Sequence, residues 1–334
     1  MSPAASPAAF LQIDEQLARA VRTGLGSRPK TLPPWLFYDQ AGSELFEQIT
    51  ELPEYYLTRT ERVILESRAG EMIALAAGGG RLRFTELGAG SAEKTRVLMK
   101  AALARQNGLV FEAVDVSATA LLAAQARIER EIPGVKVRLL EMDYTNGFEL
   151  DACEEGERRL VLYIGSSIGN FEQEEAARIL RRVRRQLDEG DGLLLGVDLV
   201  KDEAALLAAY DDAAGVTAAF NKNMLVRMNR ELGADFDLAR FNHRAVWNQT
   251  MSRMEMHLES CTGQRVRFAA LDWEVEFSAG ETIHTENSYK YRPGDAEAML
   301  AEAGFACAGT WTDDRGWFEV CLGRAEEQGT GSRE

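Results

Sequence analysis

The stretch "RLRFTELGAGSAEKT", residues 81–95, decides the fold of this chain. Its first half has the short apolar pattern of a strand, and a helix is predicted from residue 93 to residue 106. Between them Gly88 and Gly90 permit a tight turn that brings the backbone close to a ligand. The stretch therefore predicts a strand, a ligand-binding turn and a helix in succession.

The chain repeats this alternation up to residue 200. Strands and helices of similar length are predicted in turn at residues 109–117, 118–131, 135–143, 158–170, 173–187 and 190–200. Buried strands that alternate with such helices are typical of a parallel sheet with helices on both faces. The sequence therefore predicts an α/β fold with a doubly wound, Rossmann-like sheet, whose ligands lie at the carboxyl ends of the strands.

The alternation is then interrupted. Residues 202–232 have the pattern of an almost uninterrupted helix, and residues 265–291 alternate like antiparallel strands around a turn at Gly280. We therefore expect an insert at about 201–289. The first 60 residues also lack the alternating pattern, and we expect them to pack with this insert.

After the insert the pattern of the sheet returns. A helix is predicted at 294–305, and an antiparallel hairpin from residue 307 to residue 325 returns to the sheet. The polar ends, residues 1–9 and 326–334, are predicted to be flexible tails.

Composition excludes several classes of function. The chain has 334 residues and a net charge of −15, which argues against nucleic acid or an anionic membrane as partner. No apolar run approaches the roughly 18 residues that span a bilayer. Residues 1–10 lack the cationic and apolar regions of a signal peptide, so we expect a tail there. Four scattered cysteines favour a reducing, cytoplasmic location, and three histidines without ligand spacing predict no metal site.

The glycine turn by itself fits more than one ligand. A dinucleotide fingerprint has a third glycine where this chain has Ala92 or Glu93, so a nicotinamide cofactor is a weak match. Glu86, two residues before Gly88, can face a cation across the turn. The alternative is a glycine turn with a purely structural role, flanked by ordinary surface acids.

Acidic residues that end the next two strands favour one cofactor. Asp115 can receive both ribose hydroxyls, and Asp143 with Tyr144 suits an adenine amino group and ring face. An acidic residue before G-x-G, a strand-terminal acid and then Asp-Tyr is the arrangement of S-adenosylmethionine (SAM) methyltransferases. SAM carries no pyrophosphate, so a negatively charged loop suits it better than it suits a dinucleotide. The sequence therefore favours a methyltransferase over an oxidoreductase.

Three regions are candidates for the substrate side. Asn170 follows the fourth strand and offers a donor and an acceptor, although it could instead cap the next helix. Residues 33–61 are rich in aromatic side chains, a pattern that usually reflects core packing. In "IHTENSYKYR", residues 283–292, Glu286 and Ser288 project from one face of a strand and could bind a small polar group.

Taken together, these stretches resemble a known family, the L-histidine Nα-methyltransferases of ergothioneine biosynthesis. The resemblance extends from about residue 28 to residue 324, with one small departure at Ser167, where the family often has Thr. Six ordered motifs carry it: "FYDQAGSELFEQITELPEYYLTRTE", "TELGAGSAEKT", "GSSIGN", "FNKNMLVRMNRELGADFDL", "SRMEMHLES" and "ETIHTENSYKY".

The resemblance implies two domains and a full set of site residues. It implies a SAM-binding domain at 61–200 plus 290–325 and a mixed α+β substrate-binding domain at 10–60 plus 201–289. Tyr38 and Asn170 would hold the substrate α-amino group as the catalytic pair. The remaining substrate contacts would be Tyr55, Asn170 and Tyr210 for the carboxylate, Glu286 and Ser288 for the imidazole, and Met256 with Phe46 around the ring. The cofactor contacts implied are Gly88, Lys94, Asp115, Asp143 and Tyr144, beside Glu86 and Gly90 of the loop.

The implied reaction is trimethylation of the α-amino group of L-histidine to hercynine, with S-adenosylhomocysteine as by-product. The alternatives are a SAM-dependent methyltransferase of another small amino acid or amine, a protein methyltransferase on the same fold, and a non-catalytic SAM-binding protein. We expect a cytoplasmic monomer that acts on a small molecule and binds neither nucleic acid nor membrane.

Overall fold

The computed structural model describes residues 14–145 and 147–327. The tails predicted at 1–9 and 326–334 lie outside the described residues, apart from Glu326 and Glu327. The chain divides into two compact units. Unit 1 comprises Met1–Ile49, Tyr210–Val246 and Glu255–Glu286, and unit 2 comprises Thr50–Ala209, Trp247–Met254 and Asn287–Glu334.

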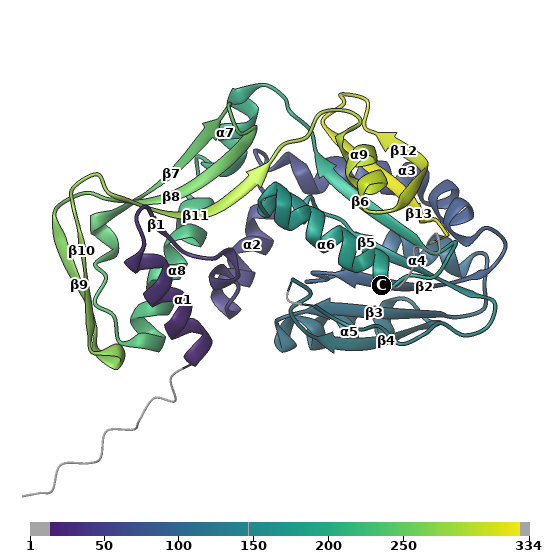
Figure 1. The fold of residues 1–334 in the computed structure, drawn as a ribbon, viewed down its shortest axis with the longest axis horizontal. Coiled ribbons are helices and arrows are strands. Elements are labelled where there is room, and N and C mark those ends of the chain that lie inside the picture. Colours follow the sequence, from purple (N-terminus) through teal and green to yellow (C-terminus); the bar gives the residue numbers. More distant parts are fainter. Residues whose placement is uncertain (1–13, 146, 328–334) are drawn as a thin grey trace, which may run out of the picture. The chain divides into compact units, whose positions relative to one another are not determined.

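Unit 2 contains a seven-stranded sheet of order β12-β13-β6-β5-β2-β3-β4 (Figure 1). Neighbouring strands from β6 to β4 are parallel, whereas β13 runs antiparallel to both β6 and β12. The predicted doubly wound sheet and its returning hairpin are therefore confirmed. The strands are β2 (Arg81–Leu87), β3 (Leu109–Asp115), β4 (Val135–Glu141), β5 (Glu157–Tyr163), β6 (Gly192–Asp198), β12 (Phe305–Thr312) and β13 (Phe318–Ala325).

Helices bury both faces of this sheet. The helices α3 (Tyr56–Ala77), α4 (Thr95–Leu103) and α5 (Ala118–Glu131) share one hydrophobic core with it. The helices α6 (Gln173–Arg185) and α9 (Asp295–Glu302) share the core on the other face. Because both faces are covered, the strands read as continuous apolar runs in the sequence.

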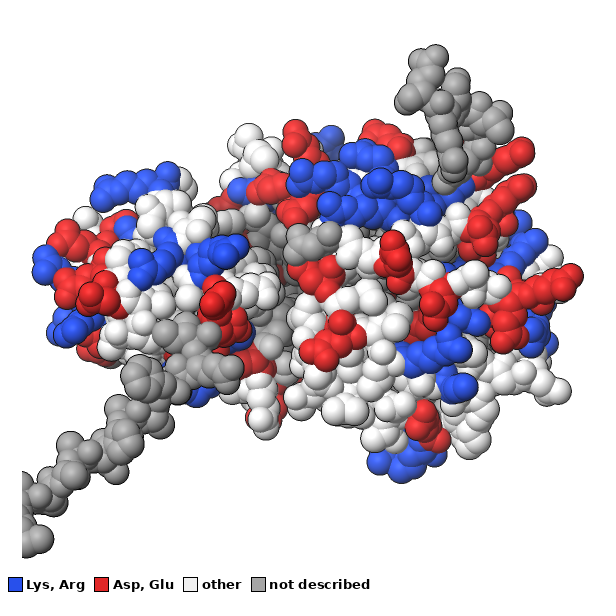
Figure 2. Space-filling view, turned by 60° about the horizontal axis from the view of Figure 1, so that its bottom comes forward, with Lys and Arg blue, Asp and Glu red and all other residues white. Residues whose placement is uncertain are grey.

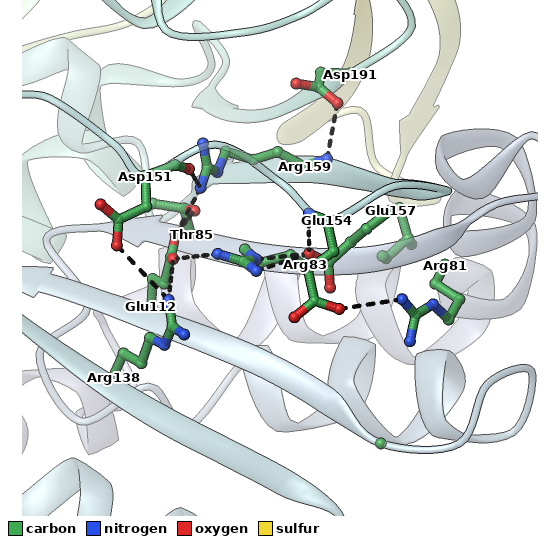
Figure 3. Close-up of polar contacts among 12 residues, drawn as sticks. Arg81, Arg83, Thr85, Glu112, Arg138, Asp151, Glu154, Glu157, Arg159 and Asp191 are labelled. Atoms are coloured by element: carbon green, nitrogen blue, oxygen red, sulfur yellow. Dashed lines mark hydrogen bonds and ion pairs between the residues drawn. The ribbon is translucent and has the colours of Figure 1, made fainter.

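A buried network of charges links three strands of the sheet (Figure 3). Glu112 of β3 lies 3.1 Å from the Arg83 guanidinium of β2 and 3.2 Å from that of Arg159 of β5. Thr85 donates its hydroxyl hydrogen to Glu112 at 2.7 Å. All four side chains are buried. Removing one partner from such a network leaves an uncompensated charge in the interior.

Unit 1 is built around a four-stranded sheet of order β1-β11-β8-β7. Its strands are β1 (Lys30–Thr31), β7 (Phe241–Asn248), β8 (Arg253–Ser260) and β11 (Thr282–Tyr289), so β8 and β11 belong to unit 1 for most of their length. A separate hairpin pairs β9 (Gln264–Phe268) with β10 (Trp273–Phe277). The helical elements are α1 (Glu15–Gly26), α2 (Gln40–Glu51), α8 (Val216–Leu232) and the 3₁₀ turns η1 (Pro34–Phe37), η3 (Leu238–Arg240) and η4 (Ala269–Leu271).

The long helix expected over 202–232 is in fact two helices. The first, α7, spans Glu203–Tyr210, and α8 begins at Val216. Asp212 accepts hydrogen bonds from the backbone amides of Val216 and Thr217, at 3.0 and 2.7 Å. Gly215 adopts a left-handed conformation with φ 75°. An aspartate that caps a helix from outside in this way explains the break, which apolar periodicity does not reveal.

The strands around Gly280 also differ from the expectation. The strands β9 and β10 do pair antiparallel, but β10 and β11 lie in different sheets, so the Gly280 turn joins no hairpin. The strands β7 and β8 were not predicted. The fourth strand of the large sheet ends at Tyr163 and not at residue 170, because Gly165 and Ser166 take positive φ before the 3₁₀ turn η2 (Ser167–Asn170).

The predicted domain boundaries differ from those of the two units. The predicted boundaries fall after residues 60, 200 and 289, and those of the units fall after residues 49, 209 and 286. The segment Trp247–Met254, which clusters with unit 2, has no counterpart in the prediction.

Candidate cofactor and substrate sites

The turn after β2 is held by the neighbouring strand. The amides of Gly88 and Ala89 both donate to the Val114 carbonyl, at 2.9 and 3.0 Å. Gly88 and Gly90 have φ of +68° and +49°, which side chains rarely adopt. A Cβ at Gly90 would meet nothing within 4 Å. The glycines are therefore needed for the backbone conformation, and the turn leaves open space beside Gly90.

Asp115 ends β3 next to this turn. Its carboxylate accepts hydrogen bonds from the amides of Gly90 and Ser117, each at 3.0 Å. These bonds fix the orientation of a half-buried carboxylate that has further lone pairs to offer. A ligand with paired hydroxyl groups fits such an acceptor.

Asp143 and Tyr144 follow β4. Asp143 accepts from the amide and the hydroxyl of Thr145, at 2.9 and 2.5 Å. The Tyr144 ring lies edge-on to Tyr163, with 5.7 Å between centroids. Burial raises the pKa of Tyr144 to about 12, so its phenol is neutral at physiological pH and can donate a hydrogen bond. A Cβ at Gly88 would lie 3.8 Å from this hydroxyl, so Tyr144 lies beside the glycine turn.

Glu86 is a buried carboxyl group near the end of β2. Burial raises its pKa to about 8, although the charge of Lys94 opposes this shift. Among the residues the structure describes, its Oε2 atom is buried and has no hydrogen-bond partner. A buried acceptor of this kind needs a donor or a cation to offset its desolvation.

Lys94, just before α4, has a partner that the sequence did not suggest. Its ammonium group pairs with Glu61 of α3, whose side chain is fully buried. Glu61 also accepts the amide hydrogen of Gly165 at 2.8 Å. One carboxylate therefore ties the start of α4 to the loop after β5. Nothing in the residue pattern around Glu61 distinguishes it from a surface acid on a helix.

Asn170 lies at the end of η2 and does not cap the next helix. The N-cap of α6 is Glu172, which makes no side-chain capping bond. Among the described residues, the half-buried Asn170 amide has no hydrogen-bond partner. Its neighbour Gly169 packs closely against Tyr289, the last residue of β11, since a Cβ at Gly169 would lie 2.9 Å from the Tyr289 carbonyl oxygen. The loop is thus held by backbone packing, and the amide is available to a ligand.

In unit 1, Tyr38 and Phe46 belong to one aromatic cluster. Each ring centroid lies 5.9 Å from that of Phe220 on α8, and the two rings lie 5.9 Å from each other. The sequence did not single out Phe220. Tyr210, at the end of α7, is buried, and its carbonyl lies 2.8 Å from His243 Nε2. Tyr55 is the N-cap residue of α3 in unit 2.

The strands β8 and β11 carry the candidate imidazole contacts. Burial alternates along β8, so Met256 lies on its buried face and His257 on the opposite one. The ring of His257 lies 5.0 Å from that of His284 on β11. Glu286, two residues after His284, shares its face of the strand, and this face is not that of Met256. The role of Met256 in the site stays a prediction.

Glu255, His257 and His284 form a cluster that the sequence did not reveal. Their ligand atoms lie within 4.8 Å of one another, so the three side chains could hold a divalent cation. Burial lowers the pKa of His257, which favours the neutral ring. The cluster forms because β8 and β11 are neighbours in the sheet, whereas a metal-site motif in a sequence shows only ligands spaced along one segment.

Ser288 is part of a buried polar network in unit 2. Its hydroxyl oxygen accepts a hydrogen bond from Lys290 Nζ at 2.8 Å. Lys290 also pairs with Asp198 at 2.8 Å, and both side chains are completely buried. Asp198 receives further bonds from Tyr56 Oη at 2.7 Å and Lys201 Nζ at 2.5 Å. Burial lowers the pKa of Lys201 to about 8.

The sequence as a whole matches a family model described as histidine-specific, SAM-dependent methyltransferase, over residues 17–325. The chain belongs to this family. It is 50% identical to a histidine N-alpha-methyltransferase of Mycolicibacterium smegmatis over 308 residues, which cover 92% of this chain and 94% of that protein. It is 46% identical to the histidine N-alpha-methyltransferase of Mycobacterium tuberculosis over 306 residues, which cover 92% and 94%.

A more distant relative carries a similar region within a larger protein. The chain is 30% identical over 300 residues to ergothioneine biosynthesis protein 1 of Neurospora crassa. The match covers 85% of this chain and 32% of that protein.

The residues around the glycine turn of this methyltransferase fit SAM. The orphaned Oε2 of Glu86 suits the positive end of the cofactor, and Asp115 suits its ribose hydroxyls. Tyr144 lies beside the same turn, and together with its neighbour Asp143 it suits the adenine. Lys94 differs, because in this structure it pairs with Glu61. Its predicted contact with the cofactor stays a prediction.

Proposed function

We propose that this methyltransferase trimethylates the α-amino group of L-histidine to hercynine, the first step of ergothioneine biosynthesis. The observation that carries the proposal is the match to the histidine-specific family together with 50% identity to a histidine N-alpha-methyltransferase over 92% of the chain. The presence of Asn170, Glu286 and Ser288 at the motif positions supports it.

Each part of histidine is proposed to have its own contacts. Tyr38 and Asn170 hold the α-amino group, and Tyr55, Tyr210 and Asn170 hold the carboxylate. Glu286 and Ser288 bind the imidazole nitrogens, and Phe46 and Met256 shape the space around the ring. The free Asn170 amide supports this assignment, because it offers both a donor and an acceptor to a zwitterionic amino acid.

SAM supplies an electrophilic methyl group, and the protein supplies alignment. Only a neutral amine has a lone pair that can attack, so the bound α-amino group must lose its proton. This group is mostly protonated at neutral pH, and a neighbouring positive charge lowers its pKa. Tyr38 and Asn170 then orient the lone pair, and most of the acceleration comes from proximity and alignment. A trimethylated nitrogen has no lone pair left, so the reaction ends there.

The proposal is tested by incubating the protein with SAM and a mixture of the twenty amino acids, followed by mass spectrometry. The expected result is a gain of three methyl groups on histidine alone. A gain on a different amino acid or amine would replace histidine with that substrate. Labelling of protein, or of nothing, would overturn the proposal.

We further propose a cytoplasmic monomer without nucleic-acid or membrane partners. Among the described residues, no helix combines the length and apolar character needed to cross a bilayer. Acidic and basic side chains are interspersed on the face shown in Figure 2, apart from one band where basic groups gather. Sedimentation and nucleic-acid binding assays test these points.

A further inference from the structure

We propose that Cys307, Cys321 and Glu297 form a binding site for a thiophilic divalent cation, Zn²⁺ being the one that this set of donors suits best. All three residues belong to unit 2, with Cys307 on β12, Cys321 on β13 and Glu297 in the first turn of α9. One ligand atom from each lies within 4.8 Å of the other two. None of the three takes part in the proposed cofactor or substrate contacts.

The distances between the donor atoms match those around a tetrahedral zinc ion. Cys307 Sγ lies 3.7 Å from Cys321 Sγ and 3.7 Å from Glu297 Oε1. With ordinary zinc–ligand lengths, two thiolates of a tetrahedral site are about 3.8 Å apart, and a thiolate and a carboxylate oxygen are about 3.6 Å apart. Two edges of the triangle of donors therefore already have the lengths that zinc requires.

A β-bulge brings Cys307 to this position. Thr310 pairs with Cys321 across the hairpin, Cys307 pairs with Gly323, and the register shifts between Cys307 and Gly309. Residues three apart, such as 307 and 310, project from opposite faces of a regular strand. The extra residue of the bulge turns Cys307 to the face of Thr310, so that its Sγ lies 3.5 Å from Thr310 Oγ1. The sequence predicts no metal site here, because this bulge and not a short motif joins the ligands.

Thr310 holds the carboxylate in place. Its hydroxyl group donates a hydrogen bond to Glu297 Oε1 at 2.6 Å and lies 3.6 Å from Cys321 Sγ. Carboxylates that bind metal ions are commonly fixed by a hydrogen bond from a residue outside the coordination shell. Glu297 is exposed, but this bond orients its carboxylate toward the two sulfur atoms.

Acidic groups around the site also favour a cation. Glu319, two residues before Cys321, shares its face of β13. Its side chain is buried, and among the described residues its Oε1 atom has no hydrogen-bond partner. Burial raises the pKa of Glu319, and so do the nearby charges of Glu297 and Asp295, although the backbone of Gly294 opposes the shift. A bound cation would offset both the desolvation and the repulsion.

Binding exchanges two thiol protons for the ion. Zn²⁺ coordinates thiolates, so Cys307 and Cys321 each release one proton to solvent, and nothing is oxidised. Burial raises the pKa of the Cys321 thiol, so the ion must displace a tightly held proton and we expect only moderate affinity. Cys307 and Glu297 are exposed, which gives the ion a route from solvent. Because α9 contacts both strands of the hairpin (Figure 1), a bound ion should stabilise this part of unit 2.

The test uses the reduced, full-length enzyme after treatment with a chelator. Titration with Co²⁺ should give the visible bands of a tetrahedral ion and a thiolate-to-cobalt charge-transfer band, with one thiolate-bound ion per chain. Competition with a chromogenic chelator should give a Zn²⁺ Kd of about 1 μM, weakened about 100-fold in Cys307→Ser and about tenfold in Glu297→Gln. Cys307 is exposed, so its replacement by serine should not disturb the fold. Absence of the charge-transfer band, or unchanged affinity in Cys307→Ser, would overturn the proposal.

Cys261→Ser is the matched control. Cys261 is also an exposed free cysteine, but it lies in unit 1, so its loss should leave Zn²⁺ affinity unchanged. A second control is His257→Asn, because His257 belongs to the other cluster whose side chains could hold a cation. This variant should keep the charge-transfer band. Loss of the band in His257→Asn, or its retention in Cys307→Ser, would place the ion elsewhere and overturn the proposal.

Thiol alkylation and thermal unfolding give two further readouts. Saturating Zn²⁺ should slow the reaction of Cys307 with iodoacetamide about tenfold and leave that of Cys261 unchanged, as peptide mass spectrometry measures. At a 100-fold excess of Zn²⁺ over Kd the Tm should rise by about 5 °C, but not in Cys307→Ser. Equal alkylation with and without Zn²⁺, or an equal rise in Tm in both proteins, would contradict the site. A Cys307–Cys321 disulfide that thiol reductants fail to open would also overturn it, because no thiolate would remain for the ion.

Discussion

The ammonium group of Lys94 forms an ion pair with the carboxylate of Glu61, which is completely buried in unit 2. Glu61 also accepts the amide hydrogen of Gly165, so it joins two loops at the carboxyl ends of neighbouring strands. The segment that carries the cofactor turn and the loop that leads to Asn170 are therefore held by one side chain. Local stability and ligand binding should both depend on it.

Glu61→Gln should lower both stability and SAM affinity. Glutamine can still accept from Gly165, but it leaves Lys94 without its counter-charge, and breaking a buried pair costs about 3 kcal/mol. Denaturant unfolding should show a loss of this order, and calorimetric titration should show SAM binding weakened about tenfold. Glu71→Gln, on the exposed side of the same helix, is the control and should change neither. Unchanged SAM affinity in Glu61→Gln would show that the ion pair does not support cofactor binding.

Glu86 should make SAM binding depend on pH. Its pKa is about 8 in the free protein, so the carboxyl group is mostly protonated at neutral pH. The positive sulfonium favours the ionised form, so SAM binding should release a proton from Glu86 below pH 8 and should strengthen as pH rises toward 8. Calorimetry in buffers of different ionisation enthalpy counts this proton. SAM binding to the Glu86→Gln variant should release about one proton less than binding to the unchanged protein. Release of equal numbers of protons would contradict the assignment.

Tyr38→Phe and Asn170→Ala should reduce turnover while leaving SAM bound. Each change removes a group proposed to orient the attacking amine, and loss of alignment is worth roughly 100-fold in rate. Single-turnover rates at saturating histidine measure the effect on the chemical step. Phe220→Leu tests whether packing around Tyr38 alone is enough to produce the loss. Unchanged turnover in both variants would show that Tyr38 and Asn170 do not orient the attacking amine.

Glu286→Ala should weaken histidine binding far more than SAM binding. The carboxylate is proposed to accept the ring N–H, and an unpaired ring donor in the site costs roughly tenfold or more in affinity. Separate titrations with histidine and with SAM measure the two effects. Glu259→Ala, on the same face of the neighbouring strand β8, is the control. Equal losses for both ligands would mean that Glu286 supports the fold.

Glu112→Ala should destabilise the sheet of unit 2. The change leaves the buried guanidinium groups of Arg83 and Arg159 without one of their counter-charges, which costs about 3–5 kcal/mol. Glu154→Ala removes an acid from the same region (Figure 3), but its pair with Arg81 is exposed, so its loss should cost about 0.5 kcal/mol. Denaturant unfolding compares the two. Equal effects would mean that the buried network adds no stability beyond a surface pair.

Much of the fold follows from local patterns. The helix predicted at 118–131 is α5, Ala118–Glu131, because its apolar period, its N-cap Ser117 and its flanking strands are all local in sequence. The strands β2, β3 and β4 and the acids that end them were predictable for the same reason. The helix break before α8 was missed, because the cap of Asp212 depends on one side-chain conformation and not on periodicity.

The sequence by itself determined the doubly wound sheet, the glycine turn and the chemical types of the residues around the cofactor. Only the tertiary structure decided that β11 lies beside β1 and β8, that Glu61 pairs with Lys94, and that Lys290 binds both Ser288 and Asp198. The physical reason is the separation along the chain between the residues that make these contacts. Side-chain periodicity records which face of an element is buried, whereas contacts such as Asp198 with Lys290, or Lys30 of β1 with Ile283 of β11, join residues far apart along the chain. Their geometry is set by the packing of whole elements.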